Sequence, residues 1–137
     1  MTDSPTPQTV LLSGASGMIG RGLKAELTAR GHSVHTLVRR PPTDSSEHQW
    51  DPEAGVVPQD IVDYADVIVN LSGASLSRIP WTPAHKKLVL SSRQQSAQTL
   101  GKAIAASTTP PHTLLQASAV GFYGDRGEDE LTEDSAV

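Results

Sequence analysis

Residues 10–20, with the sequence VLLSGASGMIG, decide the fold of this chain of 137 residues. The stretch begins as an apolar run typical of a buried strand. It ends where a helical pattern opens, with Ile19, Leu23 and Leu27 on one apolar stripe. Between the two, three glycines stand at the spacing G-x-x-G-x-x-G. Strand, glycine turn and helix, in that order, form the sequence context of a dinucleotide-binding loop.

Each glycine has an expected task in such a loop. Gly14 permits the tight turn, Gly17 lets backbone N–H groups approach a pyrophosphate at the helix N-terminus, and Gly20 allows helix and strand to pack closely. The cofactor contacts predicted from this loop are Gly14, Ser16, Gly17, Met18, Ile19 and Gly20. The alternative is an ordinary strand-turn-helix. A triphosphate-binding P-loop is excluded because Leu23 stands where that motif requires lysine.

The composition indicates one soluble globular domain. The chain is 36% hydrophobic, carries a formal net charge of -4 and has no cysteine. No apolar run reaches the roughly 18 to 20 residues that span a bilayer, so no membrane partner is expected. The negative charge argues against nucleic-acid binding. The five histidines have no recurrent spacing to one another or to acids, so no metal site is expected.

The two ends of the chain differ from its middle. Residues 1–8 are polar, contain proline and lack a signal pattern, which predicts a flexible tail and a cytoplasmic protein. Residues 125–137 hold six acidic side chains and one arginine, and an acidic stretch of this kind is typical of a solvated loop.

Two arginines predict which dinucleotide binds. Residues 33–38 form a second expected strand, and Arg39 and Arg40 follow it directly. In a dinucleotide-binding fold this strand end faces the adenosine ribose, where an acid binds the 2′-OH of NAD and arginine accommodates the 2′-phosphate of NADP. The pair therefore predicts NADP(H) in preference to NAD(H). The alternative is a pair of solvated surface arginines.

The remaining pattern completes an α/β fold. Arg30 and Gly31 should end the first helix. A short strand is expected near residues 48–51, a helix over 58–64, a buried strand over 66–71, a long helix to about residue 107 and another buried strand over 112–117. Thr82 and Pro83 should begin the long helix as its N-cap and first position. Its expected apolar stripe is Leu90, Ala97, Leu100 and Ile104, with His85 on the surface. This alternation predicts a Rossmann-type doubly wound parallel sheet.

The ends of the later strands add residues to the candidate site. Asn70, Leu71, Ser72 and Gly73 follow the strand that should lie beside the first one, and Ala117 ends the last strand. Because a cofactor lies across the carboxyl ends of such strands, we expect these residues to line it. The alternative is that they are simple loop residues.

Several motifs resemble a known family. They are Asn70-Leu71-Ser72-Gly73-Ala74, Trp81-Thr82, Ser92-Arg93, and the sequence SAVGFYGD at residues 118–125. Over residues 9 to about 135 the chain resembles the N-terminal half of an extended or atypical short-chain dehydrogenase/reductase. More narrowly, it resembles the NAD-dependent epimerase/dehydratase-like "epimerase family protein" subgroup. The glycine motif is widespread, whereas the other motifs are much more specific.

The chain departs from that family at its catalytic positions. Relatives commonly place a serine or threonine four residues before the tyrosine of their Val-Tyr-Gly-like turn, where this chain has Ala119. Ser118, one residue earlier, is the candidate for the catalytic hydroxyl. The Tyr-x-x-x-Lys pair of the family is absent, because neither Tyr64 nor Tyr123 has a lysine four residues later. In relatives that pair, further strands and a small substrate domain lie beyond position 137.

The resemblance implies that residues 9–137 form an incomplete, truncated NAD(P)-binding Rossmann domain. The leading interpretation is the NADP(H)-binding domain of a short-chain oxidoreductase or nucleoside-diphosphate-sugar epimerase-like enzyme, with an unidentified small-molecule substrate. The alternative is a non-catalytic NADP(H)-sensing or scaffold protein of the same fold. An incomplete sheet would also expose an edge through which copies of the chain could self-associate.

We expect the 137-residue chain alone to show no turnover, because it lacks the tyrosine–lysine pair that would transfer the proton. The measurement is NADPH oxidation by the purified chain with a panel of carbonyl substrates. Substrate-dependent oxidation would contradict this expectation.

Overall fold

The computed structural model describes residues 6–119 and 121–137, and the elements follow the predicted order β-α-β-β-α-β-α-β. The strands are β1 (Thr9–Ser13), β2 (Ser33–Val38), β3 (Glu47–Gln49), β4 (Val67–Asn70) and β5 (Thr113–Gln116), and the helices are α1 (Met18–Ala29), α2 (Gln59–Tyr64) and α3 (Pro83–Ala106). All four strand pairings are parallel, in the order β3-β2-β1-β4-β5. The α/β, Rossmann-type parallel sheet is therefore confirmed.

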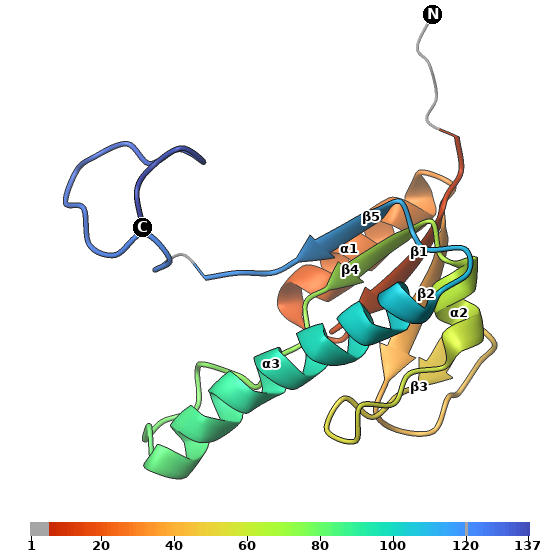
Figure 1. The fold of residues 1–137 in the computed structure, drawn as a ribbon, viewed down its shortest axis with the longest axis horizontal. Helices are drawn as coiled ribbons and strands as arrows, with labels where there is room; N and C mark the ends of the chain where they lie inside the picture. Colours follow the sequence, from red (N-terminus) through yellow and green to blue (C-terminus); the bar gives the residue numbers. More distant parts are fainter. Residues whose placement is uncertain (1–5, 120) are drawn as a thin grey trace, which may run out of the picture.

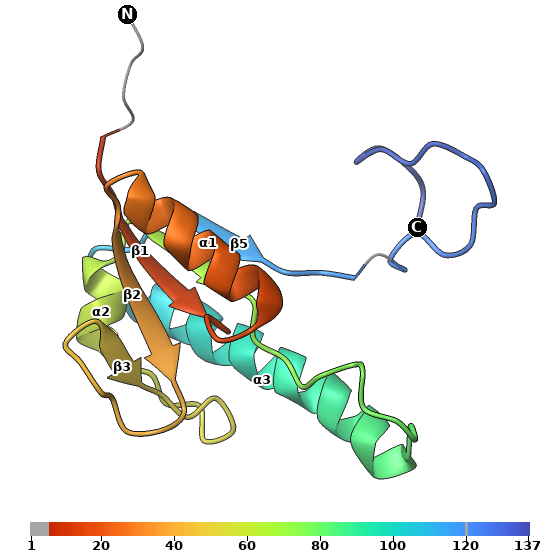
Figure 2. The same ribbon diagram turned by 180° about the vertical axis from the view of Figure 1, so that it is seen from behind.

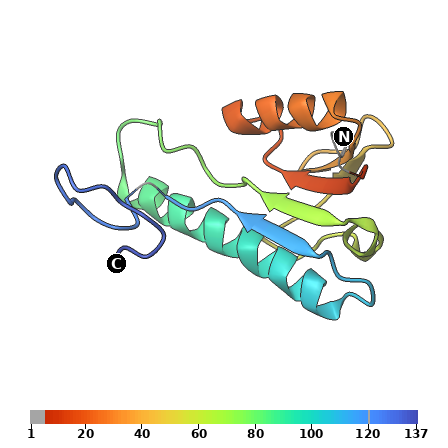
Figure 3. The same cartoon turned by 90° about the horizontal axis from the view of Figure 1, so that it is seen from above.

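The sheet is the middle of three layers, with α1 on one face and α2 and α3 on the other (Figures 1, 2 and 3). Side chains alternate between the faces along each buried strand. In β1, Leu12 packs in the cluster that includes Leu23 and Leu27 of α1, whereas Leu11 packs against Leu100 of α3. The apolar runs in the sequence are therefore strands buried on both faces, as a parallel sheet requires.

Helix α1 begins and ends where its sequence predicts, but its apolar stripe is shorter than expected. Gly31 has a φ of +84°, and the N–H groups of Gly31 and His32 donate to the carbonyls of Thr28 and Leu27. This is a Schellman ending, which satisfies the last carbonyl groups of the helix. Ile19, predicted on the buried stripe, is 66% exposed because it lies in the first turn, beyond the end of β1.

Helix α3 starts as predicted, with the Thr82 hydroxyl accepting from the His85 N–H at 3.1 Å. Two predictions within the helix were wrong. Leu90 is 59% exposed, because the N-terminal half of the helix extends beyond the sheet (Figure 1). His85, expected on the surface, is buried beneath the preceding loop, with its Nε2 atom 3.0 Å from the carbonyl oxygen of Ser75.

Two segments of the sheet differ from expectation. Gln8 belongs to the expected flexible tail but joins the sheet beside the central strand β1, since its carbonyl accepts from the Ser33 N–H at 2.9 Å. The edge strand β5 pairs only with β4 among the described strands, and its Leu114 and Leu115 are both exposed, so the predicted burial of this strand was wrong. Within the described residues, no helix combines the length and apolar character needed to cross a bilayer.

The contact between α1 and the glycine turn gives a stability prediction. A Cβ on Gly20 would overlap the carbonyl oxygen of Gly14 and approach the Cα of Ala15 to 2.7 Å, whereas a Cβ on Gly22 would meet nothing within 4 Å. We expect Gly20→Ala to lower the free energy of unfolding by about 1–3 kcal/mol, as overpacked sites do. Gly22→Ala, on the same helix, should raise it by about 0.5–1 kcal/mol. Urea denaturation measures both, and equal effects would contradict the packing argument.

Candidate functional site

The glycine turn after β1 and the loop after β4 meet at the carboxyl edge of the sheet. The strand order reverses between these two strands, so this is the topological switch point at which open α/β sheets bind ligands. Gly14 has a φ of +74°, and a Cβ there would lie 2.7 Å from the carbonyl oxygen of Leu71. Only glycine allows the two loops to approach so closely, and their approach forms a junction at this edge of the sheet.

The N-terminus of α1 lies beside this junction and has no side-chain cap. Its N-cap residue is Gly17, no side chain accepts from the first-turn N–H groups, and the first turn holds no acidic residue. The neighbouring Ser16, Gly17 and Met18 are exposed, Met18 to 82%. By contrast, α3 has the Thr82 side chain as its cap. The uncapped donors and the positive end of the α1 dipole fit an anionic pyrophosphate.

A buried polar network connects the carboxyl ends of β1, β4 and β5 at this edge of the sheet. The Oδ1 atom of Asn70 accepts from the Ser13 hydroxyl at 2.6 Å and from the Ser72 N–H at 3.2 Å. Its Nδ2 group donates to Ser96 of α3 at 3.2 Å and to Gln116 of β5 at 2.8 Å. All the hydrogen-bonding capacity of this buried amide is used, which makes the arrangement rigid.

Two consecutive residues of α3 hold the next part of the β4 loop. The Ser92 hydroxyl accepts from the Ala74 N–H at 2.9 Å, and the Arg93 Nη1 group donates to the Ala74 carbonyl at 3.2 Å. A Cβ on Gly73 would lie 2.8 Å from the Cζ atom of Arg93, so the guanidinium occupies the space that a side chain would need. The Ser-Arg motif thus fixes the loop from the helix side.

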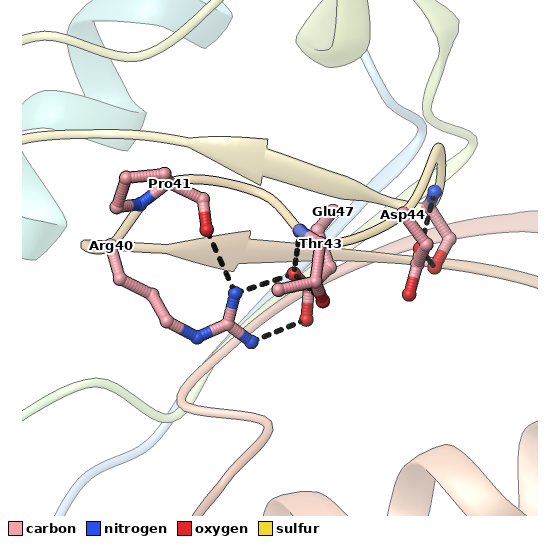
Figure 4. A network of polar contacts seen from close by, with 6 residues as sticks. Arg40, Pro41, Thr43, Asp44 and Glu47 are labelled. Carbon is pink, nitrogen blue, oxygen red and sulfur yellow. Dashed lines mark hydrogen bonds and ion pairs between the residues drawn. The ribbon is translucent and has the colours of Figure 1, made fainter.

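The arginines after β2 lie in different environments. Arg40 forms a bidentate pair with Glu47, through Nη1 at 2.6 Å and Nη2 at 2.7 Å (Figure 4). Arg39 has no hydrogen bond or ion pair to any residue of the described chain. It lines a shallow pocket of about 430 Å³ together with Gln49, Trp50, Asp51 and Val56. The predicted adenosine end of the site therefore has one unengaged and one engaged guanidinium.

The end of β5 brings the last predicted residues to the same edge. The Ala117 N–H donates to the Asn70 carbonyl at 3.0 Å, which extends the pairing of β4 and β5 by one residue. Ser118 follows and is exposed, and its hydroxyl has no hydrogen-bond partner among the described residues. The structure thus places Ser118 just beyond the paired ends of β4 and β5, and its catalytic role stays a prediction.

Sequence reasoning missed three contributors to this site: Glu47, Ser96 and Gln116. Each acts through a contact to a residue far along the chain or across a loop, such as Asn70 with Gln116 at a separation of 46 residues. A buried asparagine at the end of an apolar strand is the one signal that a polar network must surround it. In the described residues, no group of three or more histidine, aspartate or glutamate side chains could hold a metal ion.

Comparisons with known proteins agree with this geometry. The family model described as the NAD dependent epimerase/dehydratase family matches residues 10–137. An epimerase family protein of Mycobacterium leprae is 37% identical over 133 residues, which cover 95% of this chain and 43% of that protein. One of Bacillus subtilis is 36% identical, over 93% of this chain and 43% of its own length. The chain thus spans less than half the length of these curated relatives.

Two solved structures are similar in sequence and fold. A nucleoside-diphosphate sugar epimerase from Corynebacterium glutamicum is 40% identical, with a TM-score of 0.77 over 95% of this chain and 26% of that one. The human epimerase family protein SDR39U1, solved with NADPH, is 33% identical, with a TM-score of 0.72 over 84% of this chain and 38% of that one. Because the family model matches nearly the whole of this chain, from residue 10 to residue 137, the chain belongs to the NAD dependent epimerase/dehydratase family.

Proposed function

We propose that this chain is the NADP(H)-binding part of an oxidoreductase or epimerase-like enzyme. The observation that carries the proposal is the uncapped N-terminus of α1, beside the junction where the Gly14 turn meets the Leu71 carbonyl. Backbone donors at a helix N-terminus, set at a topological switch point, are the arrangement that binds a dinucleotide pyrophosphate. Membership of an NAD dependent family supports it.

The parts of the cofactor follow from the order of the strands. With the pyrophosphate at α1, the adenosine ribose lies toward the end of β2, beside Arg39 and Arg40. The nicotinamide then lies toward the ends of β4 and β5, where Gly73, Ala117 and Ser118 are found. The nicotinamide C4 carries hydride chemistry. The role proposed for Ser118 is to donate a hydrogen bond to a substrate carbonyl oxygen beside that ring.

The preference for NADP(H) rests on the arginines. The 2′-phosphate distinguishes the two cofactors, and a guanidinium donates two parallel hydrogen bonds to a phosphate. The unengaged guanidinium of Arg39 suits this task. The human relative at 33% identity was solved with NADPH, whereas MoeE5, at 26% identity, was solved with UDP-glucose and NAD. Because these similar structures contain different cofactors, selectivity has to be argued from this chain's own residues.

A calorimetric titration with NADPH and with NADH tests the cofactor assignment. We expect tighter binding of NADPH. Replacing Arg39 and Arg40 together by alanine should weaken the binding of NADPH by about 1.5–3 kcal/mol, the range for hydrogen bonds to charged groups. The binding of NADH should not change. Arg30→Ala is the matched control, since Arg30 is exposed at the C-terminal end of α1 and precedes the start of β2, at the opposite edge of the sheet from Arg39 and Arg40. Equal losses for the two cofactors would overturn the 2′-phosphate assignment, and no binding of either would overturn the proposal.

The proposed role of Ser118 gives a separate prediction. If its hydroxyl acts on the substrate, Ser118→Ala should leave the dissociation constants of NADPH and NADH within about twofold of the unaltered chain, because no cofactor contact is lost. The same calorimetric titration measures both constants. A selective loss of cofactor affinity would show that Ser118 binds the cofactor instead.

A further inference from the structure

The Arg40–Glu47 pair joins an exposed arginine to a carboxylate that is largely buried. The Glu47 side chain is only 11% exposed and the Arg40 side chain is 54% exposed. Arg40 comes two residues after β2, at the carboxyl edge of the sheet, and reaches back to the start of β3 (Figure 4). The arginine is therefore drawn from the cofactor edge toward a carboxylate that is fixed in the protein.

Glu47 is held in place by the loop that joins the two strands. The N–H and hydroxyl of Thr43 both donate to its Oε2 atom, at 2.8 and 2.9 Å. These contacts and the guanidinium of Arg40 lower the pKa of Glu47 to about 2, with the hydrogen bond from Arg40 as the largest cause. The carboxylate consequently stays charged at every pH at which cofactor binding would be measured, and it retains its hold on Arg40.

The pair leaves Arg40 poorly placed to bind a second anion. Its Nη1 group donates to both the Pro41 carbonyl and Glu47, and its Nη2 group donates to the other carboxylate oxygen. The end-on edge formed by Nη1 and Nη2 is therefore occupied, and only the side edge formed by Nε and Nη2 could still donate to a phosphate. A phosphate near Arg40 would also meet the negative charge of Glu47. NADH carries no 2′-phosphate, so neither effect applies to it.

We propose that Glu47 is a specificity-determining residue that withholds Arg40 from the 2′-phosphate and so reduces the selectivity of this site for NADPH over NADH. This inference rests on the proposed function, since it concerns the same adenosine end of the cofactor site. Arg39 is then the arginine that recognises the 2′-phosphate in the unaltered chain. Arg40 is a second arginine that could bind the phosphate end-on only when it is released from Glu47. The selectivity is set by competition between a carboxylate and a phosphate for one guanidinium.

The test is the variant Glu47→Gln, titrated by calorimetry with NADPH and with NADH. The amide oxygen can still accept from Thr43, but the charge that holds Arg40 is gone. Since a partly exposed ion pair changes an equilibrium constant by up to about fivefold, the dissociation constant of NADPH should fall by about two- to fivefold and that of NADH should not change. Adenosine 2′,5′-bisphosphate and ADP, titrated in parallel, should repeat this difference without the nicotinamide.

Two matched variants separate competition for Arg40 from a general change in charge. Asp44→Asn removes one negative charge from the same loop, and among the described residues the Asp44 carboxylate bonds only to Ser46, so NADPH binding should change by less than the gain in Glu47→Gln. In the double variant Arg40→Ala/Glu47→Gln the gain should disappear. A gain of the same size in Asp44→Asn, or one that persists without Arg40, would overturn the inference.

The outcomes distinguish this inference from the proposed function. If the unaltered chain prefers NADPH but Glu47→Gln leaves that preference unchanged or lowers it, the specificity role of Glu47 is overturned and the cofactor assignment stands. If the unaltered chain binds NADPH no more tightly than NADH and loses nothing in Arg39→Ala, the cofactor assignment fails and the role of Glu47 fails with it. The melting temperature of each variant shows whether an altered affinity reflects altered folding.

Discussion

The close approach of the Gly14 turn to the Leu71 carbonyl is the constraint on which the rest of the site depends. A Cβ at position 14 would lie 2.7 Å from that oxygen, and the φ of +74° is itself unfavourable for any other residue. Because the two loops meet, β1 and β4 can lie side by side up to their ends, and α1 starts directly above their junction. Gly20 continues the same contact, since it lets the first turn of α1 rest on the Gly14 backbone. A side chain at either position would push the helix away from the sheet and move its N-terminal donors away from the end of β4.

Polar groups, not apolar ones, keep the strand ends in register. Asn70 is fully buried, yet each of its amide groups is used, so its burial carries no cost of unmade hydrogen bonds. It links β1, β4, β5 and α3 in one network. Ser92 and Arg93 extend this support to the loop that follows β4. These hydrogen bonds are present before any ligand binds, and such preorganisation would lower the entropic cost of binding at the proposed site.

At the adenosine end of the proposed site, charges near the surface determine how strongly the chain attracts a phosphate. Arg39 is unengaged among the described residues, whereas Arg40 is bound by Glu47. Two arginines adjacent in sequence therefore offer different strengths of attraction to a phosphate. Under the proposal, replacing the carboxylate would alter cofactor selectivity without altering the fold, because the pair lies outside the two hydrophobic clusters.

The sequence by itself determined the element order, the parallel sheet and the position of the glycine turn, because these depend on local periodicity, turn chemistry and helix capping. The predicted ends of α1 and the Thr82 cap of α3 are of this kind. Only the tertiary structure decided which residues become buried along α3 and which partner each arginine has. Leu90 reads as a core residue but extends beyond the sheet, and His85 reads as a surface residue but is covered by a loop. Burial and ion pairing depend on which distant segments come together, and that information is not contained in the pattern of any single stretch.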